Sequence, residues 1–352
     1  MKKTDDPIVV VGYARTPVGS FGKALASVPA HVLGATAAKA ALERAGLTPE
    51  DAQEWIIGCV GSTGTDAYIS RRVSIEAGAP EESTAMTVNR LCGSAMQAIG
   101  LAAQELMVGE ADIVVAGGTE NMSAQPFMDF SARSGVTLGN RTVVDGTNVL
   151  ITDPFSGEAM GITAENVAER FDVSREAQDE FALESQRRAQ EALASGAVAA
   201  EITPVTISSR RGDVVVDADE HPRAGLTLEK LAGMRPVFKK DGIDPGIMCY
   251  APKPAIEKIL ERNGLSKDDI GWYEINEAFA AQALPVARDL DLDPAKVNPL
   301  GGAIAWGHPI GATGAIISMR TIENIRKNDL EWGLASMCIG GGQAVASLWR
   351  RL

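Results

Sequence analysis

Short extended runs alternate with longer helical stretches in the apolar pattern of the chain. The apolar run from Ile8 to Val11 predicts a buried strand. Residues 84–91 form a second extended run and lead into a helix over 93–109, whose apolar side chains cover several faces, as is typical of a core helix. Strands and helices that alternate in this way indicate an α/β fold around a buried sheet.

One long segment of the chain occurs twice. Residues 42–58, LERAGLTPEDAQEWIIG, return at 260–276 as LERNGLSKDDIGWYEIN. Two further pairs of segments match in the same order: Val88-Asn89 with Gly93 against Val297-Asn298 with Gly302, and 112–118 against 333–342. The preserved order predicts two duplicated halves. Residues 226–230, where the second copy should begin with a strand, are expected to be helical or looped.

The duplication divides the chain into three parts. We expect an N-terminal half over residues 1–118, an inserted loop or lid domain over 119–245, and a C-terminal half over 246–352 that lacks its opening strand. Within the insertion, Ser174 is a suitable N-cap and Gly196 a suitable stop for a helix between them.

Composition and charge exclude several classes of function. The chain has 352 residues, a mass of 37.0 kDa and a net charge of −13, which argue against binding to nucleic acid or to an anionic membrane surface. No apolar stretch is long enough to span a bilayer, and the N-terminal residues do not resemble a secretory signal. We therefore expect a cytoplasmic protein.

Cysteines and histidines are too scattered to form a disulfide framework or a metal site. The sequence therefore predicts no bound metal and a reducing compartment. The positions are cysteines 59, 92, 249 and 338 and histidines 31, 221 and 308.

One stretch of this acidic chain is rich in basic residues. Such a stretch is either a solvated face or a local site for an anionic ligand. Its members are Arg210, Arg211, Arg223, Lys230, Arg235, Lys239 and Lys240.

Cys92 stands at the junction between the extended run and the core helix that follows it. The N–H groups and dipole at a helix N-terminus favour thiolate over thiol, so we expect a lowered pKa for Cys92 and a nucleophilic role. The alternative is a buried structural cysteine.

Three other positions have residue types that suit acid–base chemistry. His308 lies in the glycine-rich segment GGAIAWGHPIGATGA, where an imidazole could accept a proton from a thiol or serve as a structural hydrogen-bonding group. Cys338 is expected at a strand end before a glycine turn whose N–H groups could form an oxyanion hole. The alternative there is a hairpin with a buried cysteine. Asn276 ends a strand and could cap a helix or hold a water.

Five segments together resemble the thiolase family, the acetyl-CoA acetyltransferases and 3-ketoacyl-CoA thiolases. They are NRLCGSAMQAI, MGITAENVAERF, NEAFAAQ, GGAIAWGHPIGATGA and CIGGGQAVAS. The resemblance covers most of the chain. It implies a duplicated αβαβα layered core, an inserted loop domain that holds coenzyme A, and a homodimer or homotetramer. It also implies acyl-CoA substrates, with no metal or redox cofactor.

The resemblance also implies a role for each matching residue. Cys92 would be acylated by the thioester, His308 would accept its proton, and Cys338 would be the second acid and base. Asn276 would hold a water that, with His308, polarises the enolate oxygen. The N–H groups of Cys92 and Gly340 would form the other oxyanion hole. Met160 would border the acyl pocket, and Arg223 would lie on the coenzyme A side.

The chain departs from the family pattern at two places. Between Gly242 and Asp244 it lacks a segment that in the family includes a serine on pantetheine and contributes one strand to each half. Ala159 stands where many members have a histidine. Three alternatives therefore stay open: a decarboxylating condensing enzyme, a non-catalytic coenzyme A binder or scaffold, and a cysteine hydrolase. Acyl chain length and the direction of the reaction are not predicted.

Overall fold

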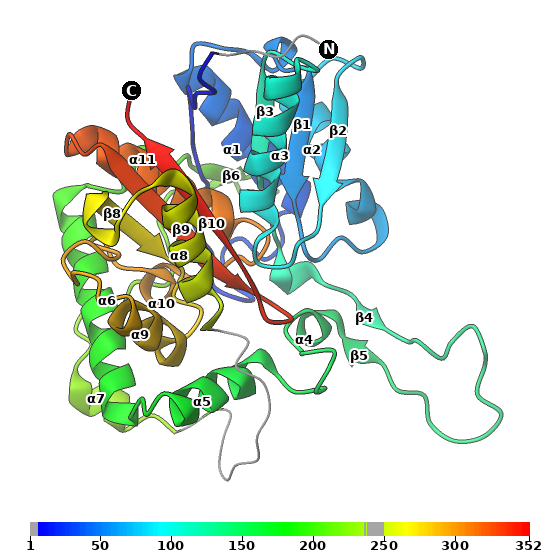
Figure 1. The fold of residues 1–352 in the computed structure, drawn as a ribbon. Coiled ribbons are helices and arrows are strands. Elements are labelled where there is room, and N and C mark those ends of the chain that lie inside the picture. The colour runs from blue at the N-terminus through cyan, green and yellow to red at the C-terminus, as the bar shows by residue number, and fades with distance from the viewer. Residues whose placement is uncertain (1–5, 236, 238–249) are drawn as a thin grey trace.

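Two sheets with helices before, between and behind them form the core of the molecule (Figure 1). The computed structural model describes residues 6–235, 237 and 250–352. Helices α1 and α2 pack together on one side of the first sheet, α3 and α11 lie between the sheets, and α8 packs against the second sheet. This order of layers is the αβαβα core that the sequence predicted.

The first sheet has three parallel strands in the order β2-β1-β3. The alternation of apolar residues along β1 explains its two buried faces: Trp55 and Ile57 pack toward α1 and α2, and Ile56 packs toward α3. The elements of this half are α1 (Ala30–Arg44), β1 (Glu54–Gly58), α2 (Ile69–Ala77), β2 (Thr84–Val88), α3 (Ser94–Val108) and β3 (Val114–Gly118).

The second sheet has the order β10-β9-β8, in which β8 is parallel and β10 antiparallel to β9. Tyr273 of β8 also forms a parallel bridge to Val297, which corresponds to the position of β2 in the first sheet. The elements of this half are α8 (Pro252–Asn263), β8 (Ile270–Ile275), α9 (Ala280–Asp289), α10 (Ala303–Trp306), α11 (Thr313–Lys327), β9 (Trp332–Ile339) and β10 (Gln343–Arg350).

The duplication extends to details of capping. A short 3-10 helix, Pro49–Asp51 in one half and Lys267–Asp269 in the other, precedes the central strand of each sheet. In each copy the residue before the short helix and the last residue of the helix form a capping box. The pair is Thr48 and Asp51 in the first half, and Ser266 and Asp269 in the second. The predicted duplication is thus confirmed, whereas the boundaries at 118 and 245 stay predictions.

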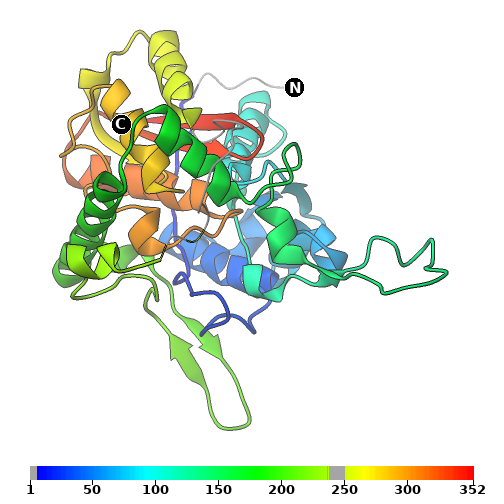
Figure 2. The same ribbon diagram turned by 90° about the horizontal axis from the view of Figure 1, so that it is seen from below.

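The chain between β3 and α8 adds two projecting hairpins and a group of helices (Figure 2). As the sequence predicted, Ser174 caps α6 through its side chain, and Gly196 ends that helix in the left-handed region at φ 70°. These elements are β4 (Phe127–Met128), β5 (Val144–Asp145), α4 (Gly146–Leu150), α5 (Met160–Arg170), α6 (Arg175–Ser195), β6 (Val205–Ile207), β7 (Val214–Val216) and α7 (Leu228–Ala232).

The strand predicted at Ile8–Val11 is wrong. Residues 7–14 belong to no sheet, and the side chains of Val9, Val10 and Val11 are 49%, 44% and 64% exposed. An apolar run becomes a strand only where a neighbouring strand completes its hydrogen bonds. The segment instead borders a cavity of about 1010 Å³ that it shares with β3, α1, α11 and the C-terminal residues Leu348–Leu352.

Both sheets end beside this cavity. Within the described residues, β3 is the last strand of the first sheet and β10 the last strand of the second, and residues of both line the cavity. We call this region, residues 7–14 with the outer edges of β3 and β10, the open flank. It agrees with the sequence-based expectation that each half is one strand short.

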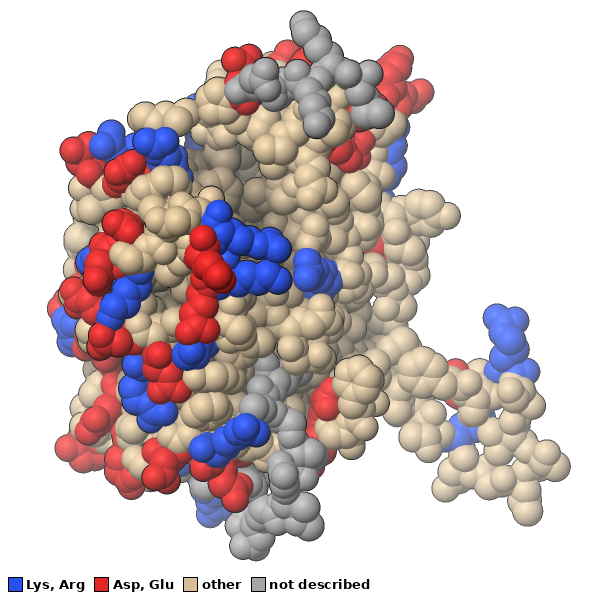
Figure 3. Space-filling view, viewed as in Figure 1, with Lys and Arg blue, Asp and Glu red and all other residues tan. Residues whose placement is uncertain are grey.

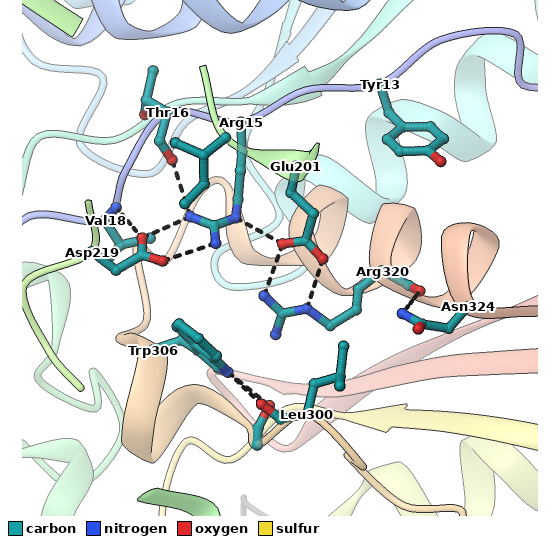
Figure 4. A network of polar contacts seen from close by, with 12 residues as sticks. Tyr13, Arg15, Thr16, Val18, Glu201, Asp219, Leu300, Trp306, Arg320 and Asn324 are labelled. Atoms are coloured by element: carbon teal, nitrogen blue, oxygen red, sulfur yellow. Dashed lines mark hydrogen bonds and ion pairs between the residues drawn. The ribbon is translucent and has the colours of Figure 1, made fainter. Parts of the chain in front are cut away.

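A buried ion cluster connects the open flank to the rest of the molecule (Figure 4). Arg15 donates to both carboxylate oxygens of Asp219, at 2.7 and 2.9 Å, and to Glu201 at 3.0 Å. Arg320 on α11 donates twice to the same Glu201, at 3.0 and 3.1 Å. Burial by itself would raise the pKa of Glu201, but Arg320 and Arg15 outweigh it and hold that pKa below its usual value.

Candidate active site

Cys92 lies in a tight turn between β2 and α3. The residue before it, Leu91, has a φ of 49°, a left-handed conformation that costs a leucine about 1–3 kcal/mol. Hydrogen bonds hold the turn: the Ser94 hydroxyl donates to Leu91 O at 2.6 Å, and Asn89 Oδ1 accepts from Leu91 N at 3.1 Å. The partly buried Cys92 therefore comes directly before the first turn of α3, as the sequence predicted.

The hairpin turn after Cys338 packs against the Cys92 turn. A Cβ atom at Gly93 would lie 2.5 Å from Ile339 Cδ1, and one at Gly340 would lie 2.7 Å from Leu91 Cδ1. The absence of a side chain at both glycines lets Ile339 and Leu91 pack in these places. Cys338 is buried at the end of β9, one residue before this contact. The two cysteine-bearing turns are therefore neighbours, although they come from different halves of the chain.

His308 enters the same region from the loop between α10 and α11. A Cβ atom at Gly314, in the first turn of α11, would lie 2.6 Å from Met96 N in the first turn of α3. The helices that follow His308 and Cys92 thus begin side by side. Burial lowers the pKa of His308 to about 4, so the imidazole is neutral near pH 7 and can accept a proton.

Asn276 connects β8 to this loop. Its backbone N–H donates to Ser336 O of β9 at 2.9 Å, and its Nδ2 lies 3.4 Å from His308 Nε2. The side chain is buried, yet its Oδ1 has no hydrogen-bond partner among the described residues. An unpartnered buried oxygen beside an imidazole suits a site that binds a polar group. We call the contact region of the Cys92, Cys338 and His308 turns with Asn276 the catalytic seam.

Two buried glutamates that the sequence reasoning missed hold the loops of this seam. Glu120 follows β3 and accepts from the N–H groups of Val60 and Gly61, each at 2.9 Å, and from Gly311 N at 3.1 Å. Burial raises the pKa of Glu120, and the three N–H donors oppose that change. Because Gly311 is in the His308 loop, a carboxylate of the first half positions a loop of the second.

Glu277, which follows β8, holds loops of the second half. It accepts from the Ser185 hydroxyl at 2.6 Å, from Asn298 Nδ2 at 2.9 Å and from Ile304 N at 3.3 Å. It thus ties the inserted helix α6 to the segment that leads to His308. An acidic residue within two positions after the GG or IN at the end of a core strand was the signal in the sequence that could have identified both glutamates.

Met160 and Arg223 occupy different places relative to the seam. The Met160 Cε atom lies 3.7 Å from the position of a Cβ at Gly340, which puts Met160 beside the Cys338 hairpin turn. Arg223 is exposed, and its N–H donates to Gln186 Oε1 at 2.7 Å. It follows His221, whose Cδ2 lies 2.6 Å from the position of a Cβ at Gly307. Arg223 is therefore near the His308 loop in the chain path.

The surface around α6 and α8 carries charges of both signs (Figure 3). The net charge of −13 is thus compatible with a local site for an anion. Arg210, Arg211, Lys230 and Arg235 of the basic stretch are described, whereas Lys239, Lys240 and Cys249 lie outside the described residues. Among the described residues there is no cluster of side chains that could hold a metal ion, and no helix is long and apolar enough to cross a membrane.

Known proteins that resemble this chain are thiolases. The thiolase N-terminal domain model matches residues 8–247, and the thiolase C-terminal domain model matches residues 228–351. The acetyl-CoA acetyltransferase of Cupriavidus necator is 42% identical over 384 residues, with 96% of this chain and 98% of that protein covered. The acetyl-CoA acetyltransferase of Paracoccus denitrificans is 42% identical over 383 residues, with 96% and 97% covered.

Solved structures give the same picture. The acetyl-CoA acetyltransferase of Bacillus anthracis has a TM-score of 0.94 and 38% identity, with 98% of each chain covered. The human mitochondrial 3-ketoacyl-CoA thiolase has a TM-score of 0.93 and 37% identity, with 97% of this chain and 98% of that chain covered. The alignment of 384 positions with the Cupriavidus protein exceeds the 352 residues here, so that relative has segments without a counterpart in this chain.

Proposed function

Because this chain belongs to the thiolase family of acyl-CoA C-acyltransferases, we propose that its catalytic seam cleaves and forms 3-ketoacyl-CoA through an acyl-Cys92 intermediate. The observation that carries this proposal is the contact between the Cys92 turn and the Cys338–Gly340 turn, with His308 Nε2 facing Asn276. A thioester reaction that breaks a carbon–carbon bond needs a thiolate and two proton carriers in one place.

In the thiolytic direction Cys92 acts first. His308 Nε2 accepts the Cys92 proton, and the sulfur attacks the 3-keto carbon of the substrate. The bond between C2 and C3 breaks, the acyl group stays on Cys92, and the electron pair leaves on C2 of an acetyl-CoA enolate. Cys338 protonates that C2. The Cys338 thiolate then takes the proton of the coenzyme A thiol, and the coenzyme A sulfur attacks the acyl-Cys92 thioester. This releases the shortened acyl-CoA and the Cys92 thiolate, which recovers its proton from His308. Condensation uses the same steps in reverse.

Two sites stabilise the negative oxygen atoms that form. The backbone N–H groups of Cys92 and Gly340, which lie in adjacent turns, donate to the oxyanion that forms on the carbon attacked by Cys92. In such sites each donor contributes about 3 kcal/mol of transition-state stabilisation. Asn276 and His308 serve the enolate oxygen, Asn276 through a bound water. The unpartnered Asn276 Oδ1 supports this assignment.

Coenzyme A is both substrate and product, and the reaction requires no metal or redox cofactor. Arg223 and the neighbouring basic residues offer positive charge for its phosphates, and Met160 beside Gly340 borders the acyl group. Because several of the related proteins are acetyl-CoA acetyltransferases, acetyl is the first acyl group to test. A cytoplasmic location and a place in lipid metabolism belong to this proposal.

Self-association is the remaining part of the proposal. The loop between β4 and β5 projects from the body (Figures 1 and 2) and exposes Phe130 at 75% and Leu138 at 94%. Such apolar side chains on an extended arm favour contact with a second copy of the chain, as a homodimer or homotetramer. Leu138→Asp should lower the molar mass measured by light scattering, whereas an unchanged mass would contradict an arm-mediated assembly.

Two reactions separate the roles of the two cysteines. Exchange of labelled coenzyme A into acetyl-CoA needs only acyl transfer to Cys92, whereas thiolysis of acetoacetyl-CoA also needs Cys338. Cys338→Ser should therefore retain exchange and lose thiolysis, and Cys92→Ser should lose both. Cys59→Ala removes a buried thiol that lies in neither turn and contacts Glu120 at 3.6 Å, so it should retain both reactions, with a loss no larger than that of Glu120→Gln.

The alternatives predict different products from the same experiment. A cysteine hydrolase would release free acetate, and a decarboxylating enzyme would act on a malonyl thioester with loss of CO2. A non-catalytic coenzyme A binder would show neither exchange nor thiolysis. Any of these results with the wild-type protein would overturn the proposed reaction.

A further inference from the structure

The two ring nitrogens of His308 have different partners. Nδ1 lies 2.7 Å from the Thr313 hydroxyl, and Nε2 lies 3.4 Å from Asn276 Nδ2. Thr313 is the first residue of α11 and is 2% exposed, so its hydroxyl has no access to bulk water. The tautomer of His308 therefore depends on which of these groups donates.

The Thr313 hydroxyl has a second hydrogen-bond partner, which determines whether the hydroxyl donates to His308 or accepts from it. Its Oγ1 donates to Pro309 O at 2.9 Å, the bond from a helical threonine to the carbonyl four residues earlier. A hydroxyl has one proton, so Oγ1 must accept from His308 Nδ1. Nε2 then carries the lone pair, which fits the amide group of Asn276 that points toward it.

The first half contains a similar arrangement, in which the donor and the acceptor of each hydrogen bond are unambiguous. Ser94, the first residue of α3, donates from its hydroxyl to Leu91 O at 2.6 Å and accepts from Arg90 N at 2.9 Å. A backbone N–H can only donate, so the Ser94 hydroxyl must accept there and donate to the carbonyl. Thr313 at the start of α11 has a similar pair of partners: its hydroxyl donates to the carbonyl of Pro309, four residues earlier rather than three, and the His308 ring takes the place of the Arg90 N–H.

We propose that Thr313 is a positioning residue that holds His308 as the Nδ1–H tautomer and keeps Nε2 as the proton acceptor for Cys92. The catalytic consequence of this inference rests on the proposed function. The tautomer of His308 does not depend on that function. Thr313 acts through His308 and touches no substrate. Without the hydroxyl, the ring could turn or take the Nε2–H form, in which Nε2 cannot accept the thiol proton.

The first test measures the tautomer directly. In protein with ¹⁵N-labelled histidine, ¹⁵N–¹H correlation spectra distinguish protonated from unprotonated ring nitrogens, and His31→Gln and His221→Gln variants assign the His308 signals. We expect Nδ1 protonated and Nε2 unprotonated in the wild type, and loss of this single form in Thr313→Val. An Nε2–H form in the wild type would overturn the proposal, whether or not the protein is a thiolase.

The second test uses steady-state kinetics with a matched control. Thr321 lies on the same helix, is fully buried, and donates to Ile317 O at 2.8 Å without contact to His308. Thr313→Val should lower kcat for acetoacetyl-CoA thiolysis about 10- to 100-fold with a change in KM below about threefold. Thr313→Ser should restore kcat to within about threefold, and Thr321→Val should stay near the wild type.

A purely structural role of Thr313 gives another pattern. In that case Thr313→Val and Thr321→Val would lower kcat equally, or Thr313→Ser would fail to restore it, and the proposal would be wrong. An inactive wild-type protein would refute the proposed function instead, and the spectra would still decide the tautomer.

Discussion

The catalytic seam, at the starts of α3 and α11, and the open flank, at the outer edges of β3 and β10, differ in how they are held. At the seam, glycines bring turns from both halves to within van der Waals contact, and a Cβ at Gly118 would lie 2.1 Å from Gly311 O. At the flank, β3 and β10 have no outer neighbour among the described residues and border a cavity of about 1010 Å³. Within the described residues, the turns of the seam are packed against one another, whereas β3 and β10 each leave one strand edge unpaired.

This difference separates the part of the fold that performs chemistry from the part that supports it. The seam depends on strand ends, helix starts and buried glutamates, all of which are near each other within the described residues. The flank depends on strands that pair over long distances in the chain. Loss of flank strands therefore lowers stability before it alters the arrangement of His308 and Asn276.

The buried ion cluster that connects the open flank to the rest of the molecule should give the largest change in stability. Glu201→Gln leaves Arg15 and Arg320 buried without their shared carboxylate, which should cost about 3–5 kcal/mol in the free energy of unfolding measured with urea. A loss below about 1 kcal/mol would show that the cluster contributes little to the stability of the fold.

The same variant should change the pH dependence of stability. The pKa of Glu201 is lower in the folded state than its ordinary value of 4.5, so its stabilisation is present above that value and is lost as the pH falls. The wild type should therefore lose stability below about pH 4.5 more steeply than Glu201→Gln.

Neighbouring glycines of β3 provide a direct comparison of seam and flank. A Cβ at Gly118 would collide with the backbone of the His308 loop, whereas one at Gly117 would meet no atom within 4 Å. Gly118→Ala should lower kcat for thiolysis about 100-fold, because a displacement of about 1 Å has an effect of that size. Gly117→Ala should stay within about twofold of the wild type. Equal losses in both variants would contradict the separation of seam and flank.

Amide hydrogen exchange should distinguish the two edges of β3. Thr119 N donates to Gly58 O of β1. Because successive N–H groups of a strand point to opposite sides, those of Val115 and Gly117 point toward β1, and those of Val114 and Ala116 point toward the cavity. The cavity-side amides should exchange about 100-fold faster in NMR measurements. Uniform protection along β3 would show that the flank edge is covered.

Glu120→Gln should give the smallest effect. Glutamine keeps one oxygen for the N–H groups of Val60, Gly61 and Gly311 but presents an amide to the others, so the His308 loop loses part of its support. We expect a decrease in kcat of about tenfold with stability changed by about 1 kcal/mol. The matched change Glu105→Gln, a carboxyl outside the seam, should leave kcat unchanged.

The sequence predicted the elements whose signals are local. Ser174 and Gly196 marked the ends of α6, and the repeat of residues 42–58 at 260–276 predicted the duplicated core. Cys92 precedes a helix, Cys338 lies at a strand end and His308 lies in a glycine-rich loop, as the sequence predicted. These features depend on capping, periodicity and glycine positions, which neighbouring residues determine.

Features that depend on distant partners escaped the sequence reasoning. The run Ile8–Val11 has the composition of a strand, but its state depends on whether β3 has another strand beside it. Glu120 of the first half accepts a hydrogen bond from Gly311 N of the second half, and no local sequence pattern predicts that contact. Even Thr313, only five residues from His308, could be interpreted only once the contact with Pro309 was known.

The central claim is that Cys92 is the residue that receives the acyl group. The most direct measurement is mass spectrometry of the protein and its peptides after brief exposure to acetyl-CoA, with Cys338→Ser beside the wild type. We predict one added acetyl group on the peptide that contains Cys92 in both proteins. An acetyl group on Cys338 or Cys59 alone, or no covalent acetyl group in a protein that turns over acetoacetyl-CoA, would contradict the account.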